Sequence, residues 1–260
     1  MTPDLRVYQP AGPTKALVLV LHGGRPWSAR PTASWHSAYQ RMVPFARALR
    51  DAVRPAGGEV WLLRNRVRGW NEPQQDAVAD ARWALAEAAR RHPGVPVVVV
   101  GHSMGGRVAL RVADHADVVG ACALAPWVES SEPIDQLSGR AVLIAHGDLD
   151  EWTSCPQSYE FAVRARQVAA SVARFEVPGC GHFMLRRPAD WIGVVTCFVR
   201  GVLDETPHPA IAEAMRAPAP DGLRLPLPSG GWDRLPARAE ARGLESQAGF
   251  LRHHHEPLAS

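Results

Sequence analysis

A serine between two glycines, at the end of an apolar run, constrains this chain more than any other feature. Val97–Val100 are four β-branched residues in succession, and Gly-x-Ser-x-Gly follows at 101–105. Residues 107–113 then have helical spacing. The order predicts a buried strand, a sharp turn with Ser103 at its tip, and a helix. The glycines suit such a turn because larger residues would collide there, so Ser103 is the candidate nucleophile.

An alternative interpretation is a glycine-rich turn that only changes chain direction or that holds a phosphate at the helix N-terminus. Phosphate-binding loops of that type carry Gly-Lys-Ser/Thr, and no such sequence follows Gly105. We therefore favour the nucleophile.

Length and composition predict a globular protein with one full core. The chain has 260 residues, 46% of them hydrophobic, and a formal charge of +3. Lys15 is the only lysine, and the arginines are dispersed among acids without forming a basic stripe. A nucleic-acid surface is therefore not expected. The sequence does not fix the oligomeric state.

No apolar stretch approaches the length of a membrane span, and residues 1–12 lack the apolar core of a signal peptide. We expect a cytoplasmic protein without membrane contact. The four cysteines are far apart and form no Cys-x-x-Cys pair, so neither a zinc site nor a disulfide framework is predicted. No metal or other cofactor is expected, and the His253–His255 run is interpreted as inert.

Strand and helix patterns alternate along the first 204 residues. Predicted strands are Leu5–Tyr8, Ala16–Leu21, Val60–Leu63, Val97–Val100, Val118–Ala125, Arg140–His146 and Ala173–Val177. Predicted helices are 33–53, 73–91, 107–113, 156–171 and 188–203. This alternation predicts an α/β fold, a three-layer α/β/α sandwich with a mostly parallel sheet. Residues 205–260 are rich in proline and small residues and predict a mostly irregular tail outside that domain, with a helical turn near 211–215.

Polar residues follow several of the predicted strands. His22-Gly23-Gly24 ends the strand at 16–21, a pattern that suits close backbone approach to a ligand and an available N–H group. Arg64, Arg66 and Arg68 alternate after another strand. They could hold an anionic group, but we favour ion pairs with acids on neighbouring helices.

A serine hydroxyl needs a base within hydrogen-bonding reach and an acid that orients this base. His182 follows the strand at 173–177 in a glycine-flanked loop and is the candidate base. Asp148, Asp150 and Glu151 follow the strand at 140–145 and compete for the role of the acid. We choose Asp150, because Asp148 follows a glycine directly and suits a turn-stabilising role.

These motifs resemble those of the α/β-hydrolase superfamily over residues 5–203. Gly101–Gly106 resembles its nucleophile elbow, His146-Gly147-x-x-Asp150 its acid loop, and Gly181-His182 its histidine loop. His22-Gly23-Gly24 resembles its oxyanion loop. The order serine, acid, histidine is the one this superfamily uses.

The resemblance implies a serine hydrolase with a small-molecule acyl substrate and an acyl-enzyme intermediate. Ser103, His182 and Asp150 would form a catalytic triad, and the backbone N–H groups of Gly24 and Met104 would bind the oxyanion. An ester or a thioester would be the substrate. A non-catalytic binding protein on the same scaffold and a cofactor-free haloperoxidase activity are the alternatives.

The chain offers little to cover such a site. Only residues 126–139 separate two predicted strands at the position where relatives carry a helical cap, which predicts a shallow, open site. Four residues are expected to line the pocket, with ordinary packing as the alternative for the tryptophans: Arg25, Trp70, Trp127 and Trp152.

Overall fold

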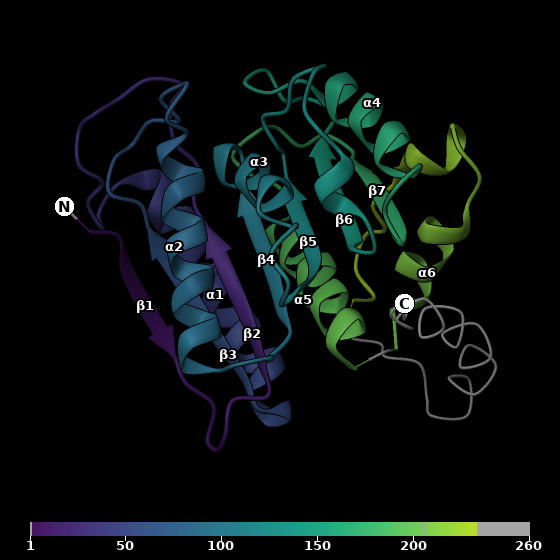
Figure 1. The fold of residues 1–260 in the computed structure, drawn as a ribbon. Helices are drawn as coiled ribbons and strands as arrows, with labels where there is room; N and C mark the ends of the chain where they lie inside the picture. The colour runs from purple at the N-terminus through teal and green to yellow at the C-terminus, as the bar shows by residue number, and fades with distance from the viewer. Residues whose placement is uncertain (1, 205, 233–260) are drawn as a thin grey trace, which may run out of the picture.

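The computed structural model describes residues 2–204 and 206–232. Its centre is an eight-stranded sheet with the order β1-β3-β2-β4-β5-β6-β7-β8. The strands are β1 (Asp4–Tyr8), β2 (Ala16–Leu21), β3 (Gly58–Arg64), β4 (Val97–His102), β5 (Val118–Leu124), β6 (Ala141–Gly147), β7 (Ser171–Val177) and β8 (Leu225–Pro226). β1 is antiparallel to β3, and every other neighbouring pair is parallel. Figure 1 shows the twisted sheet with helices on both sides.

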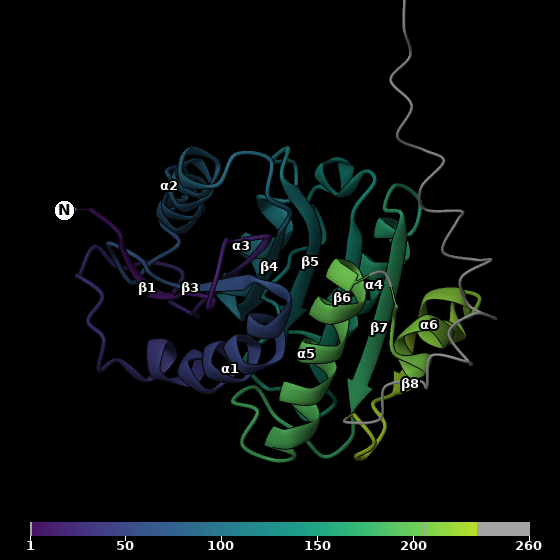
Figure 2. The same ribbon diagram turned by 90° about the horizontal axis from the view of Figure 1, so that it is seen from below.

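Helices cover both faces of the sheet. They are α1 (Ser37–Val53), α2 (Asp76–Arg91), α3 (Met104–Arg111), α4 (Cys155–Ala165), α5 (Pro188–Asp204) and α6 (Pro209–Arg216). Buried residues of α2, α3 and α4 share one apolar cluster with one face, and those of α1, α5 and α6 share another with the opposite face. Figure 2 shows α1 and α5 on one side and α2 on the other. The predicted three-layer α/β/α architecture is confirmed.

The uninterrupted apolar strands follow from this double coverage. In β2, Leu17 and Leu19 pack in the cluster of α2 and α3, whereas Val18 and Val20 pack in the cluster of α1 and α5. Successive side chains of a strand point to opposite faces, so a strand covered on both faces needs apolar residues throughout.

The strand order reverses between β2 and β4. The chain runs from β2 outward to β3 and then returns to pair β4 with the other edge of β2. In parallel sheets the loops after two such strands diverge and leave room for a ligand at their carboxyl ends. The residues after β2 and β4 are His22–Gly24 and Ser103, so the topology brings two predicted site segments together.

Element boundaries differ from the predictions at a few ends. The helix expected from residue 73 begins at Asp76, since Asn71 and Gln75 adopt positive φ angles of 58° and 49° and turn the chain before it. The helix expected to reach residue 171 ends at Ala165, because β7 begins at Ser171.

The segment between β5 and β6 is short and is held close to α3. It contains a single 3-10 turn, Asp135–Leu137. The buried Glu132 accepts a hydrogen bond of 2.6 Å from Arg107 Nε and pairs with Arg111, and both arginines belong to α3. No larger cap is inserted between these two strands, as the sequence predicted.

Residues 206–232 pack on the sheet, which differs from the expectation of an irregular segment there. The helical turn expected near 211–215 is the longer helix α6, and β8 pairs with β7. Ile211, Leu227 and Trp232 are buried in the cluster of α1 and α5. Residues 233–260, including His253–His255, lie outside the described residues, so the predicted domain boundary and tail stay predictions.

Within the described ranges, no helix has the length and apolar character needed to cross a membrane. The same ranges hold no group of three or more His, Cys, Asp or Glu residues arranged to hold a metal ion.

Candidate active site

Ser103 lies at the junction of β4 and α3 in a strained conformation. Its φ of 57° and ψ of −120° are unusual for a residue with a side chain. A Cβ atom on Gly101 would come within 2.0 Å of the Gly105 carbonyl oxygen, and one on Gly105 within 2.6 Å of the Leu21 and His22 carbonyl oxygens. Both glycines of the motif are therefore required by close backbone packing, and the turn presents a half-buried hydroxyl.

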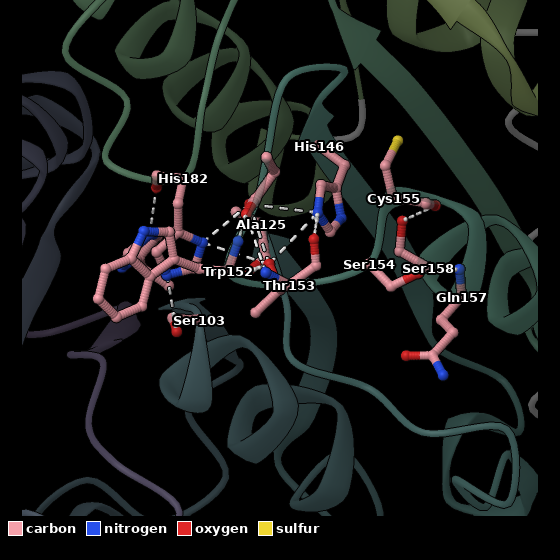
Figure 3. A network of polar contacts seen from close by, with 12 residues as sticks. Ser103, Ala125, His146, Trp152, Thr153, Ser154, Cys155, Gln157, Ser158 and His182 are labelled. Carbon is pink, nitrogen blue, oxygen red and sulfur yellow. Dashed lines mark hydrogen bonds and ion pairs between the residues drawn. The ribbon is translucent and has the colours of Figure 1, made fainter.

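A chain of hydrogen bonds connects Ser103 to His182 and Asp150. His182 Nε2 is 3.0 Å from Ser103 Oγ, and His182 Nδ1 is 2.8 Å from Asp150 Oδ2. The carboxylate can only accept, so Nδ1 carries the ring hydrogen and Nε2 accepts from the serine hydroxyl. The structure brings together the three residues chosen from sequence. Figure 3 shows His182 above Ser103.

Both carboxylate oxygens of Asp150 receive hydrogen bonds. The N–H groups of Trp152 and Thr153 donate to Oδ1 at 2.8 and 2.9 Å, and the Thr153 hydroxyl donates to Oδ2 at 2.9 Å. His146 Nε2 is 3.3 Å from the same Oδ2 atom. Figure 3 shows His146 and Thr153 converging with His182 on this network.

The pKa of Asp150 reflects two opposing effects. Burial alone would raise it, since the side chain has no exposed surface. Hydrogen bonds from His146, His182 and the Thr153 backbone outweigh burial and hold the pKa of this carboxyl far below its usual range. Asp150 therefore stays ionised at neutral pH and fixes the orientation of the His182 ring.

The competing acid Asp148 lies elsewhere in the same loop. Asp148 is exposed, and its backbone N–H is 3.4 Å from the carbonyl oxygen of Val177, the last residue of β7. The structure thus connects Asp150, rather than Asp148, to His182.

The roles of His146 and Thr153 were not predicted. His146 appeared in the sequence only as part of the His-Gly-x-x-Asp motif. Burial is the main cause that lowers its pKa, so it is a neutral donor to Asp150. The spacing of four residues between His146 and Asp150 across the end of β6 is the signal that could have indicated their contact.

The predicted oxyanion residues Gly24 and Met104 lie against each other. A Cβ on Gly24 would come within 2.4 Å of Met104 Cε and 2.6 Å of the Arg68 carbonyl oxygen. Among the described residues, neither the Gly24 nor the Met104 backbone N–H has an acceptor. These two donors, one at the N-terminus of α3 and one in the loop after β2, suit a developing negative charge at Ser103.

His22 fixes the loop that carries Gly24. Its Nε2 accepts from the Asn65 N–H at 3.2 Å, so its Nδ1 carries the hydrogen and donates to the Gly23 carbonyl oxygen at 2.6 Å. Burial lowers the pKa of His22 to about 4, and the ring is neutral at physiological pH.

A second buried histidine, His102, contacts the loop that carries His182. Its Nε2–H donates to the His182 carbonyl oxygen at 2.8 Å, and its Nδ1 has no partner among the described residues. Burial, aided by the positive charge that His182 can carry, lowers the pKa of His102 to about 3. This role was missed, because position 102 is variable in a Gly-x-Ser-x-Gly pattern.

The predicted pocket residues occupy different environments. Trp70 is 1% exposed and packs in the core, in line with the ordinary-packing alternative. Its ring contacts Trp127 edge-on, and the Arg107 guanidinium lies 4.3 and 4.7 Å from the two ring centroids. Trp127 is half-buried, and its backbone N–H donates to the Ser103 carbonyl oxygen at 3.2 Å.

Trp152 and Arg25 are exposed, and they follow β6 and β2, which lie on opposite sides of β4 in the sheet. The Trp152 indole is 72% exposed and stacks on the His182 ring, with ring centroids 6.2 Å apart. Both side chains are drawn in Figure 3. Phe183, next to it, is 38% exposed. Arg25 follows Gly24 directly, and its side chain is exposed. Its backbone N–H donates to the Arg68 carbonyl oxygen at 2.8 Å.

The three alternating arginines after β3 divide into two groups. Arg64 pairs with Asp4 at 2.9 Å, and Arg66 pairs with Asp76 and Asp80 of α2. Arg66 matches the favoured interpretation of a pair with acids on a neighbouring helix, whereas the partner of Arg64 lies on the strand β1. Arg68 forms no ion pair with any residue in 2–204 or 206–232.

This arrangement supplies the parts for acyl transfer: a hydroxyl with a hydrogen-bond acceptor, a carboxylate that orients the acceptor, and two free N–H donors beside the hydroxyl. These parts come from the carboxyl ends of four strands: β2 for Gly24, β4 for Ser103 and Met104, β6 for Asp150 and β7 for His182.

Comparisons with known proteins agree with the fold. The profile of the serine aminopeptidase S33 family matches residues 64–145, which include the elbow. A search of curated protein sequences finds no match.

Several solved structures are similar over most of their length. An α/β serine hydrolase without lid from Xanthomonas campestris is 22% identical, with 76% of this chain and 88% of that chain covered and a TM-score of 0.57. A putative α/β hydrolase from Agrobacterium tumefaciens is 15% identical, with coverages of 78% and 92% and a TM-score of 0.62. Est1E from Butyrivibrio proteoclasticus is 15% identical, with coverages of 78% and 95% and a TM-score of 0.55. These likenesses establish a shared fold.

Proposed function

The chain belongs by its fold to the α/β-hydrolase superfamily, and from this premise we propose that it is a serine hydrolase that cleaves a carboxylic ester or thioester. The observation that carries the proposal is the pair of contacts at 3.0 and 2.8 Å that connects Ser103 through His182 to Asp150. Two esterases among the proteins of similar fold support the substrate class.

In the proposed reaction, Ser103 Oγ attacks the acyl carbon while its proton moves to His182 Nε2. The resulting imidazolium donates from Nδ1 to Asp150, which is ionised and fixed by its own hydrogen bonds. The carbonyl oxygen becomes an oxyanion that accepts from the N–H groups of Met104 and Gly24. No group has to rotate before the attack, because the serine and histidine are already in contact.

Breakdown of the tetrahedral intermediate returns the proton. His182 Nε2–H protonates the leaving alkoxide or thiolate as its bond to the acyl carbon breaks, and the acyl group remains on Ser103. Water then attacks the acyl carbon, gives its proton to Nε2, and the carboxylic acid leaves as Ser103 regains its hydrogen.

The proposed substrate is a small or extended acyl compound. Ser103 is half-buried, and the short segment after β5 is drawn towards α3 by Glu132, which leaves the hydroxyl reachable. The exposed Trp152 and Phe183 offer an apolar surface next to His182. This openness suits a substrate that lies across the site rather than a lipid chain enclosed in a tunnel.

Labelling with a fluorophosphonate tests the nucleophile directly. We expect one adduct on Ser103, located by peptide mass spectrometry, and we expect Ser103→Ala to lose the adduct and all turnover of 4-nitrophenyl acetate above buffer. Ser130→Ala, which removes an exposed hydroxyl from the segment after β5, is the matched control and should behave as wild type.

Turnover by Ser103→Ala at the wild-type rate would reject the assignment. Absence of an adduct in folded protein would favour the binding-protein alternative. Assay of acyl-thioesters and an aminoacyl 4-nitroanilide beside the esters tests the choice of substrate, because the matching family profile is that of an aminopeptidase.

A further inference from the structure

An open hollow next to the oxyanion loop has three arginines and no acid among the described residues that line it. Its volume is about 380 Å³, and its lining consists of Arg25, Trp27, Ser28, Ala29, Arg30 and Arg68. Within residues 2–204 and 206–232, no carboxylate pairs with any of the three arginines. By contrast, Arg64 at the end of β3 and Arg66 just after it have acidic partners, so the arginines of the hollow differ from these two neighbours.

The hollow is framed by two segments with a fixed mutual register. The backbone N–H of Arg25 donates to the Arg68 carbonyl oxygen at 2.8 Å, and the backbone N–H of Arg68 donates to the Arg30 carbonyl oxygen at 3.0 Å. The Ser28 N–H donates to Asn71 Oδ1 at 2.9 Å. The arginines are therefore presented from a paired backbone and not from one loose loop.

This frame continues into the proposed oxyanion site. Gly24 directly precedes Arg25, and its Cα lies so close to the Arg68 carbonyl oxygen that a Cβ would come within 2.6 Å of it. One substrate molecule could therefore place its acyl carbonyl oxygen at the Gly24 N–H and an anionic group in the hollow.

The residues that line the hollow are suited to bind a carboxylate or a phosphate group. A guanidinium presents a planar fork of N–H donors that matches the oxygens of a carboxylate or a phosphate. Three like charges in one hollow repel one another and give the fold no ion pair in return. Trp27 is 66% exposed and adds an aromatic wall beside them.

We infer that Arg25 and Arg68, with Arg30 at the rim, form a subsite for an anionic group of the substrate, either a carboxylate or a phosphate. This inference rests on the proposed hydrolase function and narrows it: the substrate is an ester or thioester that carries a negative charge on the side of the oxyanion loop. Its apolar part lies towards Trp152 and Phe183, across Ser103.

Paired substrates test the subsite. 4-Nitrophenyl hydrogen adipate and 4-nitrophenyl methyl adipate differ only in a charge on the acyl side, and 4-acetoxybenzoate and its methyl ester differ only in a charge on the leaving group. We expect wild type to prefer the anionic member of one pair. Arg25→Gln and Arg68→Gln should each lower kcat/KM for that member about 10-fold, mainly through KM, because one charge-assisted contact is lost.

Arg47→Gln is the matched control. Arg47 is exposed on α1, which covers the opposite face of the sheet from α2 and α3, and it has no ion pair among the described residues. This variant removes the same charge from the molecule and should keep the preference. Equal hydrolysis of charged and neutral esters by all four proteins would overturn the subsite and leave the hydrolase proposal intact.

Binding separates the two proposals when no ester is turned over. Benzoate and phenyl phosphate are titrated into the protein while tryptophan emission is followed, and Trp27→Phe identifies the part of the signal that arises in the hollow. Saturable binding that Arg25→Gln and Arg68→Gln weaken and Arg47→Gln keeps supports the subsite even without turnover. The anion that binds more tightly distinguishes carboxylate from phosphate, and no binding of either anion rejects the subsite.

Discussion

The two regions on either side of Ser103 differ in whether their polar groups have hydrogen-bond partners. The relay flank, residues 146–153 with His182, buries its carboxylate and gives both oxygens of Asp150 hydrogen-bond donors. The oxyanion flank, residues 22–25 with Arg68, keeps the Gly24 N–H and two guanidinium groups without partners among the described residues. Satisfied polar groups fix a geometry, whereas unsatisfied ones retain their capacity to bind. The relay flank therefore fixes the proposed base, and the oxyanion flank is ready to receive a substrate.

Replacing Asp150 by Asn breaks the relay flank with the largest expected effect. An amide donates where the carboxylate accepted, which favours the ring tautomer that cannot take a proton from Ser103. We expect kcat for 4-nitrophenyl acetate to fall by about 10³-fold to 10⁴-fold, with little change in KM. Steady-state kinetics measures this, and circular dichroism verifies the fold.

Asp148→Asn is the control within the same loop. Asp148 is exposed and does not reach His182, so kcat should stay within about 2-fold of wild type. A large loss in this variant, equal to that of Asp150→Asn, would contradict the division of roles between the two acids.

The relay flank shows how far local sequence patterns reach. Ser103, Asp150 and His182 were predicted because each stands in a short motif after an apolar strand. The hydrogen bond from Thr153 to Asp150 was not predicted, although it lies within the single loop after β6. The contact of His102 with the His182 carbonyl oxygen was not predicted either, since it depends on how the ends of β4 and β7 meet. That contact joins residues that no spacing rule connects.

The oxyanion flank shows where charge patterns fail. Arg66 and Arg68 look equivalent in sequence, but the two acids that pair with Arg66, Asp76 and Asp80, lie on α2, and neither pairs with Arg68. Residues 206–232 were difficult for a similar reason. Their short helix and two-residue strand gain order from packing on β7, and composition alone indicates an irregular segment.

Gly24→Ala tests the oxyanion flank and should have the second largest effect. The Met104 side chain can move away from the added Cβ, but the Arg68 carbonyl oxygen belongs to the backbone, so the loop that presents the N–H has to shift. We expect kcat to fall by about 10²-fold, the usual cost of one lost oxyanion donor. The rate of fluorophosphonate labelling should fall in parallel.

Gly12→Ala is the matched control, because no atom of the described residues lies within 4 Å of a Cβ at that position. It should leave kcat, KM and the labelling rate unchanged. Wild-type kinetics in Gly24→Ala would remove Gly24 from the oxyanion site and would also weaken the contrast between the two flanks.

The two flanks are alike in one respect, since a buried neutral histidine supports each of them. His102 holds the relay flank through the His182 carbonyl oxygen, and His22 holds the oxyanion flank through the Gly23 carbonyl oxygen. Burial lowers their pKa values from an ordinary 6.5 to about 3 and about 4. Below pH 6.5 the unfolded chain binds protons that the folded protein excludes, so stability is full above that pH and is lost as the pH falls towards the folded-state values.

His102→Gln should remove part of this pH dependence, and this is the smallest of the expected effects. Between about pH 7 and about pH 4.5, His102 alone should cost the wild type about 2 kcal/mol of unfolding free energy, because its unfolded form is almost fully protonated at the lower pH. Asp150 adds little in this range, since its carboxyl is ionised in both states there. Urea unfolding of wild type, His102→Gln and His22→Gln at both pH values measures the difference, with His115→Gln as a control at a partly exposed histidine. Each of the first two variants should show a smaller loss of stability on acidification than wild type. If the unfolding free energy of His22→Gln alone kept the pH dependence of wild type, His22 would take up its proton in the folded protein. The two histidines would then resemble each other only in their positions.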